Sequence, residues 1–147
     1  MANLEYITSE RFIHDDICRE AKAGLKTLYS SWAKDGRIYS FVMVWPSERI
    51  RVRGKSTEHA VHFVLPKERE YWSKYLIRLI QKTAAYALLL VEQRKQAVVV
   101  IVESNHGSKS WHIPIENHGD ILSLGQPEER VDTDAVGLLW RPKKASA

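Results

Sequence analysis

Basic side chains occupy every second position of the stretch "ERIRVRGK", residues 48–55. They are Arg49, Arg51, Arg53 and Lys55. In a β-strand, alternate residues share one face at about 7 Å spacing, close to the separation of successive phosphates on an extended single strand. Guanidinium groups fit phosphate and can stack on bases. The stripe therefore predicts a phosphate-binding strand, although the same alternation is typical of any half-exposed strand.

A second basic row lies in a predicted helix, at Lys74, Arg78 and Lys82. These residues recur every four positions and share a helix face of about 80°, where like charges repel by a few tenths of a kcal/mol. That arrangement favours an anionic partner. It is explained equally well if the row is simply the solvent-exposed face of an otherwise buried helix. For a ring that stacks on bases, Trp45 is the preferred candidate, ahead of Tyr71 and Trp111. Large aromatic residues belong more often to the core.

Charge is unevenly distributed along the 147 residues, whose net charge is +4. Residues 37–66 contain five basic and two acidic side chains, and residues 67–96 contain seven and three. Both flanks are slightly acidic. The basic centre of the chain would attract a polyanion if folding gathers these charges on one surface.

A histidine-rich segment, residues 103–120, offers a different chemistry. It contains Glu103, His106, His112, Glu116, His118 and Asp120. A hairpin could place Glu103 and His112 on neighbouring strands, where imidazole and carboxylate suit zinc or manganese. However, no recognised ligand motif is present, and "NHG", which occurs twice, is typical of turns. We expect no metal site here. A small-molecule-binding or metal-dependent catalytic domain using Glu103, His112 and His118 is the alternative hypothesis.

Motifs of common enzyme classes are missing from the sequence. It has neither a glycine-rich phosphate loop nor G-x-S-x-G. The expected order of elements resembles the core of restriction-endonuclease-like nucleases in topology only, because "TEHAVHF" supplies Glu58 without the lysine those enzymes need. Cys18 is the single cysteine, which excludes an intrachain disulfide. His14 falls at the helical angle of Trp32, which predicts a partly buried structural histidine. We expect no enzymatic activity and no cofactor.

The first predicted element of secondary structure is an amphipathic helix, from Thr8 or Ser9 to about Gly36. Predicted strands follow at "RIYSFVMVW", the arginine stripe and "HAVHFVL". A long helix is predicted from about Lys67 to Gln93, with its uncharged second half, "TAAYALLLV", buried on nearly every side. The expected pocket of the alternative hypothesis lies between this helix and the sheet.

Further strands are predicted at "AVVVIVE" and "WHIPI", and weaker ones at "ILSL" and "AVGLLW" on either side of an acidic loop, residues 125–134. This order, α-βββ-α-ββ(β), predicts an α+β fold with a mostly antiparallel sheet of about five to seven strands packed against two helices. We expect one domain over residues 1–140 and a flexible basic tail over residues 141–147.

Nothing in the sequence predicts a membrane protein. The start, "MANLEYITSERF", lacks the pattern of a signal peptide. The longest uncharged run in the apolar centre is residues 83–91, and a span needs about 20 residues. The leading hypothesis is a cytoplasmic, non-enzymatic domain that binds single-stranded nucleic acid or another extended polyanion. A homodimer that pairs through "TAAYALLLV" or an edge strand is compatible with either function.

Overall fold

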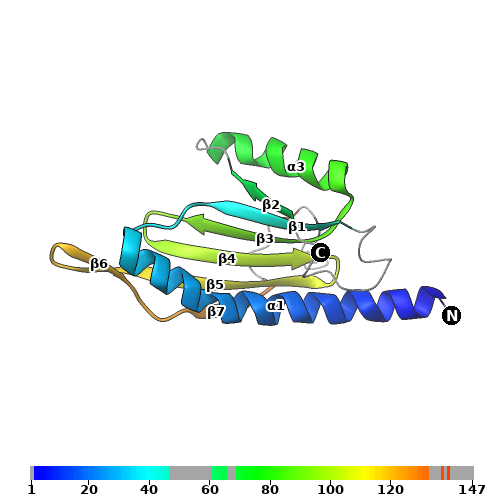
Figure 1. Ribbon diagram of the computed structural model, residues 1–147, viewed down its shortest axis with the longest axis horizontal. Helices are drawn as coiled ribbons and strands as arrows, with labels where there is room; N and C mark the ends of the chain where they lie inside the picture. The colour runs from blue at the N-terminus through cyan, green and yellow to red at the C-terminus, as the bar shows by residue number, and fades with distance from the viewer. Residues whose placement is uncertain (1, 47–60, 66–68, 133–136, 138, 140–147) are drawn as a thin grey trace, which may run out of the picture.

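A computed structural model describes residues 2–46, 61–65, 69–132, 137 and 139 (Figure 1). Two helices flank a seven-stranded antiparallel sheet whose strand order is β2-β1-β3-β4-β5-β6, with β7 also paired to β5. The predicted α+β class is therefore confirmed, with the element order α-β-β-α-βββββ.

The chain begins with a long helix and an antiparallel strand pair: α1 (Ala2–Asp35), β1 (Phe41–Pro46) and β2 (Val61–Val64). A short 3-10 helix then leads into the second long helix: η2 (Arg69–Tyr71) and α3 (Trp72–Thr83). Five strands complete the sheet: β3 (Ala85–Gln93), β4 (Ala97–Ser104), β5 (Gly107–His118), β6 (Ile121–Leu124) and β7 (Glu128–Val131).

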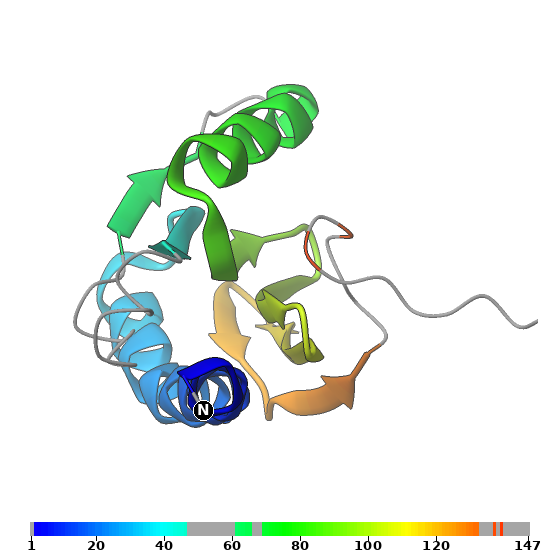
Figure 2. The same ribbon diagram turned by 90° about the vertical axis from the view of Figure 1, so that its right-hand side faces the viewer.

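The sheet has a hydrophobic core on each face, one beneath each helix. Along β4, Val98, Val100 and Val102 belong to the cluster that includes α1 residues, whereas Val99 and Ile101 belong to the cluster beneath α3. Figure 2 shows α1 and α3 well apart, with the sheet running between them. A strand covered on both faces has no reason to alternate, which explains the continuous apolar run "AVVVIVE".

The prediction of one long helix from about Lys67 to Gln93 is wrong beyond Thr83. α3 ends there, because Ala84 adopts a left-handed conformation (φ 49°, ψ 47°) and the next residue starts β3. β3 lies between β1 and β4 and is buried along most of its length. A short uncharged apolar run suits a central strand as well as a buried helix, and periodicity alone does not separate the two.

The prediction of an acidic loop over residues 125–134 is also partly wrong, because this segment contains β7. This strand pairs with residues 109–112 of β5, while β6, the predicted "ILSL" strand, pairs with residues 115–118. Side chains stabilise the unexpected strand: Trp111 Nε1 donates to Glu129 Oε1 at 3.1 Å, and Lys109 Nζ lies 3.6 Å from the same oxygen. Most of the predicted "AVGLLW" strand lies outside the described residues.

Neither helix is suited to a membrane. α1 is long enough, but within the described residues no helix combines that length with the hydropathy of a membrane span.

Candidate functional site

The outer face of α3 carries the second basic row. Trp72, Leu76 and Leu79 are buried against the sheet, so the opposite side of the helix faces solvent. The exposed basic residues on that side are Lys74, Arg78 and Lys82. α3 contains no aspartate or glutamate. The predicted placement of this row on an exposed helix face is confirmed, and its function remains a prediction.

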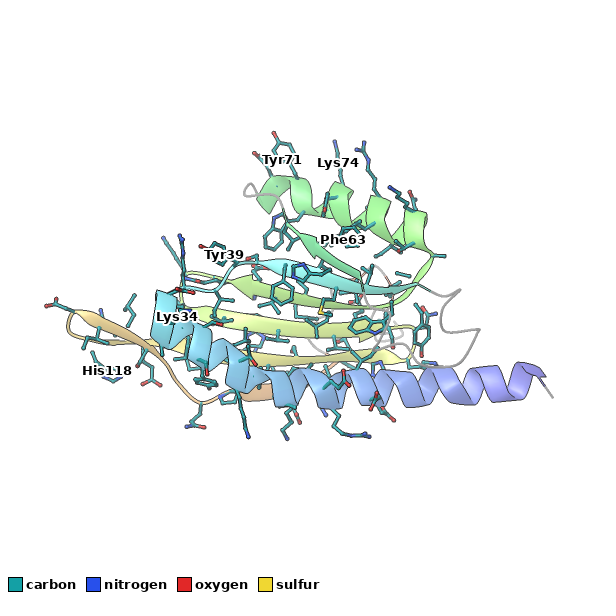
Figure 3. The ribbon with its side chains drawn as sticks, viewed as in Figure 1. Lys34, Tyr39, Phe63, Tyr71, Lys74 and His118 are labelled. Atoms are coloured by element: carbon teal, nitrogen blue, oxygen red, sulfur yellow. The ribbon has the colours of Figure 1, made fainter. Side chains whose placement is uncertain are left out.

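Tyr71 joins this row at the start of α3. It is the last residue of η2, has helical backbone angles, and its side chain is 55% exposed. At 100° per residue it falls between Lys74 and Lys82 around the helix axis. Figure 3 shows Tyr71 and Lys74 pointing away from the sheet. We call Tyr71, Lys74, Arg78 and Lys82 the α3 row.

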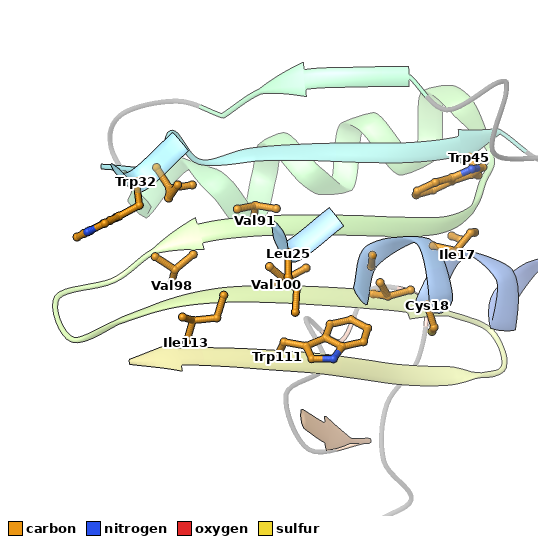
Figure 4. Packing of buried hydrophobic residues seen from close by; sticks show 14 of the residues in the cluster. Ile17, Cys18, Leu25, Trp32, Trp45, Val91, Val98, Val100, Trp111 and Ile113 are labelled. Carbon is orange, nitrogen blue, oxygen red and sulfur yellow. The ribbon is translucent and has the colours of Figure 1, made fainter. Parts of the chain in front are cut away.

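Trp45 does not fit the stacking role predicted for it. Its side chain is only 3% exposed and belongs to the core cluster beneath α1, where it lies beside Ile17 (Figure 4). A ring that is buried so completely has no free face for a base. Of the three rings considered, Trp111 is buried as well, and Tyr71 alone is exposed.

The arginine stripe lies outside the described residues. Arg49, Arg51, Arg53 and Lys55 all fall between residues 47 and 60. The predicted phosphate-binding role of the stripe therefore stays a prediction.

The histidine-rich segment forms the β4–β5 hairpin without gathering its polar groups. Glu103 and His112 do lie on neighbouring strands, but their register partners are Ser108 and Val99, about 13 Å apart along the hairpin. His118 is exposed near the far end of β5 (Figure 3), 3.3 Å from Glu116 Oε2. Among the described residues, no group of three or more His, Cys, Asp or Glu side chains could hold a metal ion.

Glu103 has a structural explanation. Its side chain is fully buried, and its carboxylate accepts backbone N–H groups from Gly137 at 3.0 Å and from Leu139 at 2.8 Å. These bonds tie Gly137 and Leu139 to the α3 side of the sheet, where Leu139 packs on the core.

His14 is buried, as the sequence predicted, and it joins α1 to the β4–β5 turn. Its Nδ1 is hydrogen-bonded to Ser104 Oγ, which also accepts the backbone N–H of His106 at 3.1 Å. Its Nε2 lies 3.8 Å from Cys18 Sγ. The ring therefore contacts side chains from both elements, and this position fits a structural histidine.

A pocket of about 410 Å³ lies between α1 and the sheet. The sequence predicted a pocket between the sheet and the helix at residues 67–93, and the observed pocket lies under the other helix, α1. We call it the α1 pocket, and its walls include Ala21, Gly24 and Leu28 from α1 with Phe41, Met43 and Leu89 from β1 and β3. The small residues Ala21 and Gly24 on the apolar face of α1 were the sequence signal that could have indicated it.

Glu20 lies on the wall of the α1 pocket. Partial burial raises the pKa of its carboxyl group, and the nearby negative charge of Asp16 raises it further. The pKa of Tyr29, on the same helix, is raised by burial and then by Glu116. Both shifts report negative charge close to partly desolvated groups.

No protein-family model, curated protein or solved structure matches this chain.

Proposed function

We propose that this protein is a non-enzymatic domain that binds single-stranded nucleic acid or another extended polyanion through the α3 row. The observation that carries this proposal is the combination of three exposed cationic side chains on α3, which has no acidic residue, with one exposed ring, Tyr71, at the end of the short 3-10 helix directly before it. Single-strand binding requires those two components: cations that follow the backbone and rings on which bases stack.

The spacing of the α3 row suits an extended backbone. Residues four positions apart on a helix are separated by about 6 Å along the axis, so Lys74, Arg78 and Lys82 form a line about 12 Å long. Successive phosphates of an extended single strand have a similar separation, so the three side chains could neutralise neighbouring phosphates. Each phosphate neutralised on a single strand contributes about −0.7 to the slope of log affinity against log salt.

The salt dependence of binding distinguishes one surface from two. If the α3 row acts alone, three contacts give a slope of about −2. If the arginine stripe, with its four basic residues, lies on the same surface, seven contacts give a slope of about −5. Fluorescence anisotropy of a short labelled oligothymidylate, repeated over a range of salt concentrations, measures this slope.

The test of the row is a charge reversal. We expect Lys74→Glu combined with Arg78→Glu to weaken binding about tenfold or more and to make the salt slope shallower. The matched control is Lys22→Glu with Lys26→Glu, which reverses two exposed charges at the same spacing on α1 and should leave affinity unchanged. Equal affinities of wild type and the α3 double variant would contradict the proposal.

Tyr71 is tested separately from charge. Stacking of one base on a ring contributes about 1–3 kcal/mol, so Tyr71→Ala should lower affinity by about 5- to 150-fold without changing the salt slope. Tyr39→Ala is the control, because Tyr39 is also exposed but lies outside α3.

The contribution of the arginine stripe is tested by Arg51→Glu with Arg53→Glu, which should abolish binding without unfolding the protein if the stripe shares a surface with the α3 row. Undiminished affinity in this variant would confine the site to α3.

A further inference from the structure

We propose that the α1 pocket binds an elongated apolar molecule that ends in a protonated amine. This inference is independent of polyanion binding, because it uses the opposite face of the sheet. It rests on the volume of the pocket, on the reason why it is open, and on the charges around it.

The volume and the lining suit a small molecule. About 410 Å³ lies within the range of roughly 300–1,000 Å³ that is usual for such sites. Phe41, Met43 and Leu89 pack against the core but remain half-buried, so they expose apolar surface that a ligand could cover. Trp45 forms part of the same wall, beside Ile17 (Figure 4).

The pocket is open because α1 is displaced toward the β6 side of the sheet. Its main contacts are with β4 and β6. Trp32 Nε1 donates to the carbonyl oxygen of Leu122 at 2.9 Å, and the Tyr29 hydroxyl donates to that of Gly125. These bonds hold the C-terminal half of α1 away from β1. The apolar face of β1 and β3 is therefore incompletely covered, because α1 lies to one side of it and has small residues there.

Gly24 marks the empty space most clearly. A Cβ atom added at this position would have no heavy atom within 4 Å. Gly24 lies in the middle of α1, where glycine weakens a helix by about 0.5–1 kcal/mol relative to alanine. Filling this position would therefore narrow the pocket without disturbing a packed neighbour.

The charges at the pocket favour a cation. Glu20 and Asp35 line it about 22 Å apart along α1, so a terminal amine would pair with one of them, and neither forms an ion pair within the described part of the chain. The lining has one basic residue, Arg37, which donates to the Tyr39 hydroxyl and whose guanidinium carbon lies 4.7 Å from the Tyr39 ring. Acidic side chains in the lining therefore outnumber basic ones by two to one. Burial raises the pKa of Glu20, and the neighbouring Asp16 carboxylate raises it further; an ammonium group beside Glu20 would relieve both effects.

Binding is tested with a bromoalkylamine below its micelle concentration, because bromine quenches tryptophan fluorescence at short range. We expect saturable quenching in the wild type that is largely lost in Trp45→Phe. Gly24→Phe should weaken binding at least tenfold, whereas the matched variant Ala23→Phe, on the adjacent exposed position, should bind as the wild type does. Unaltered binding by Gly24→Phe, or no quenching of the wild type, would overturn the proposal.

The charge of the head group is tested with a dodecyl series by competition. The amine should bind about two- to fivefold more tightly than the alcohol, as expected for a partly exposed ion pair, and the carboxylate more weakly than both. Glu20→Gln with Asp35→Asn should remove the advantage of the amine. A carboxylate that binds as tightly as the amine would overturn the assignment.

Light scattering distinguishes a small ligand from a second copy of the chain. A wild-type dimer that Gly24→Phe dissociates and that the amine leaves intact would show that a second subunit fills the pocket, and would overturn the proposal. A wild-type protein whose mass is unchanged by Gly24→Phe supports it.

Discussion

The two faces of the sheet are covered by helices in different ways. α3 lies over β1 and β3 and packs Trp72, Leu76 and Leu79 against them. The outer face of α3 is therefore the surface available for binding on this side of the sheet. α1 lies over β4 and β6 and leaves the other face of β1 and β3 partly open. Both helices are amphipathic. A helix that covers the sheet centrally thus offers its outer face as a binding surface, whereas a displaced helix leaves a binding surface beside it on the sheet.

The largest difference between the two sides is expected in packing. Leu76→Ala should lower the free energy of unfolding by about 2–5 kcal/mol, because Leu76 is enclosed beneath α3. Leu28→Ala should cost about 1 kcal/mol, since Leu28 is half-buried and already borders the α1 pocket. Urea unfolding of both variants measures the contrast. Equal losses would show that the α1 side is packed as closely as the α3 side.

Glu103 is predicted to have a comparable effect on the α3 side. Glu103→Ala should lower the free energy of unfolding by about 3 kcal/mol, because the N–H groups of Gly137 and Leu139 lose a charged acceptor. Glu103→Gln retains one acceptor oxygen and should cost less. Chemical denaturation followed by circular dichroism measures both. An unchanged free energy of unfolding in Glu103→Ala would mean that these bonds do not hold Gly137 and Leu139 in place.

Gly24 on the α1 side should respond in the opposite direction. Gly24→Ala is expected to raise the free energy of unfolding by about 0.5–1 kcal/mol, because alanine favours the helix and its Cβ meets no neighbour. Ala23→Gly, one position away on the exposed surface, should lower it by a similar amount. Thermal unfolding of the pair gives the result. Destabilisation by Gly24→Ala would show that the space beside Gly24 is occupied.

The smallest expected effect is the pH dependence of Glu20. Its pKa in the folded protein is raised, so the folded state holds the proton more tightly than the unfolded state does. The stability of wild type relative to Glu20→Gln should therefore fall as pH rises from about 4, near the ordinary value of a glutamate. Melting temperatures of both proteins at acid and neutral pH measure this. A difference that does not change with pH would contradict the raised pKa.

Much of the architecture was predictable from local patterns. The amphipathic residues of α1, the β-branched run of β4 and the alternation of Trp111 and Ile113 in β5 each matched the structure, because the periodicity of a segment reports which of its faces is buried. Prediction failed at Ala84, where one left-handed residue ends α3 and converts an expected helix into β3. It also failed at Glu128–Val131, where partners on β5 stabilise an acidic strand.

The candidate sites divide in the same way. Lys74, Arg78 and Lys82 could be assigned to one face from their spacing, since that property depends only on the helix they belong to. Trp45 could not be assigned, because an aromatic residue at a strand end is exposed or buried according to what packs opposite it. In this protein α1 packs opposite Trp45 and buries its ring. The α1 pocket was equally hidden, since it results from the position of a helix and not from its sequence.

Local sequence patterns were enough to establish the α+β class, the amphipathic character of the two helices and the exposure of the basic row on α3. Those properties follow from hydrophobic periodicity, which acts over neighbouring residues. Three other features were set by long-range packing: residues 85–93 form a strand between β1 and β4, Tyr71 and not Trp45 is the exposed ring, and α1 leaves a pocket beside Gly24. Each of these depends on which segments, distant along the chain, exclude water from one another, and that choice is made when the whole core is packed.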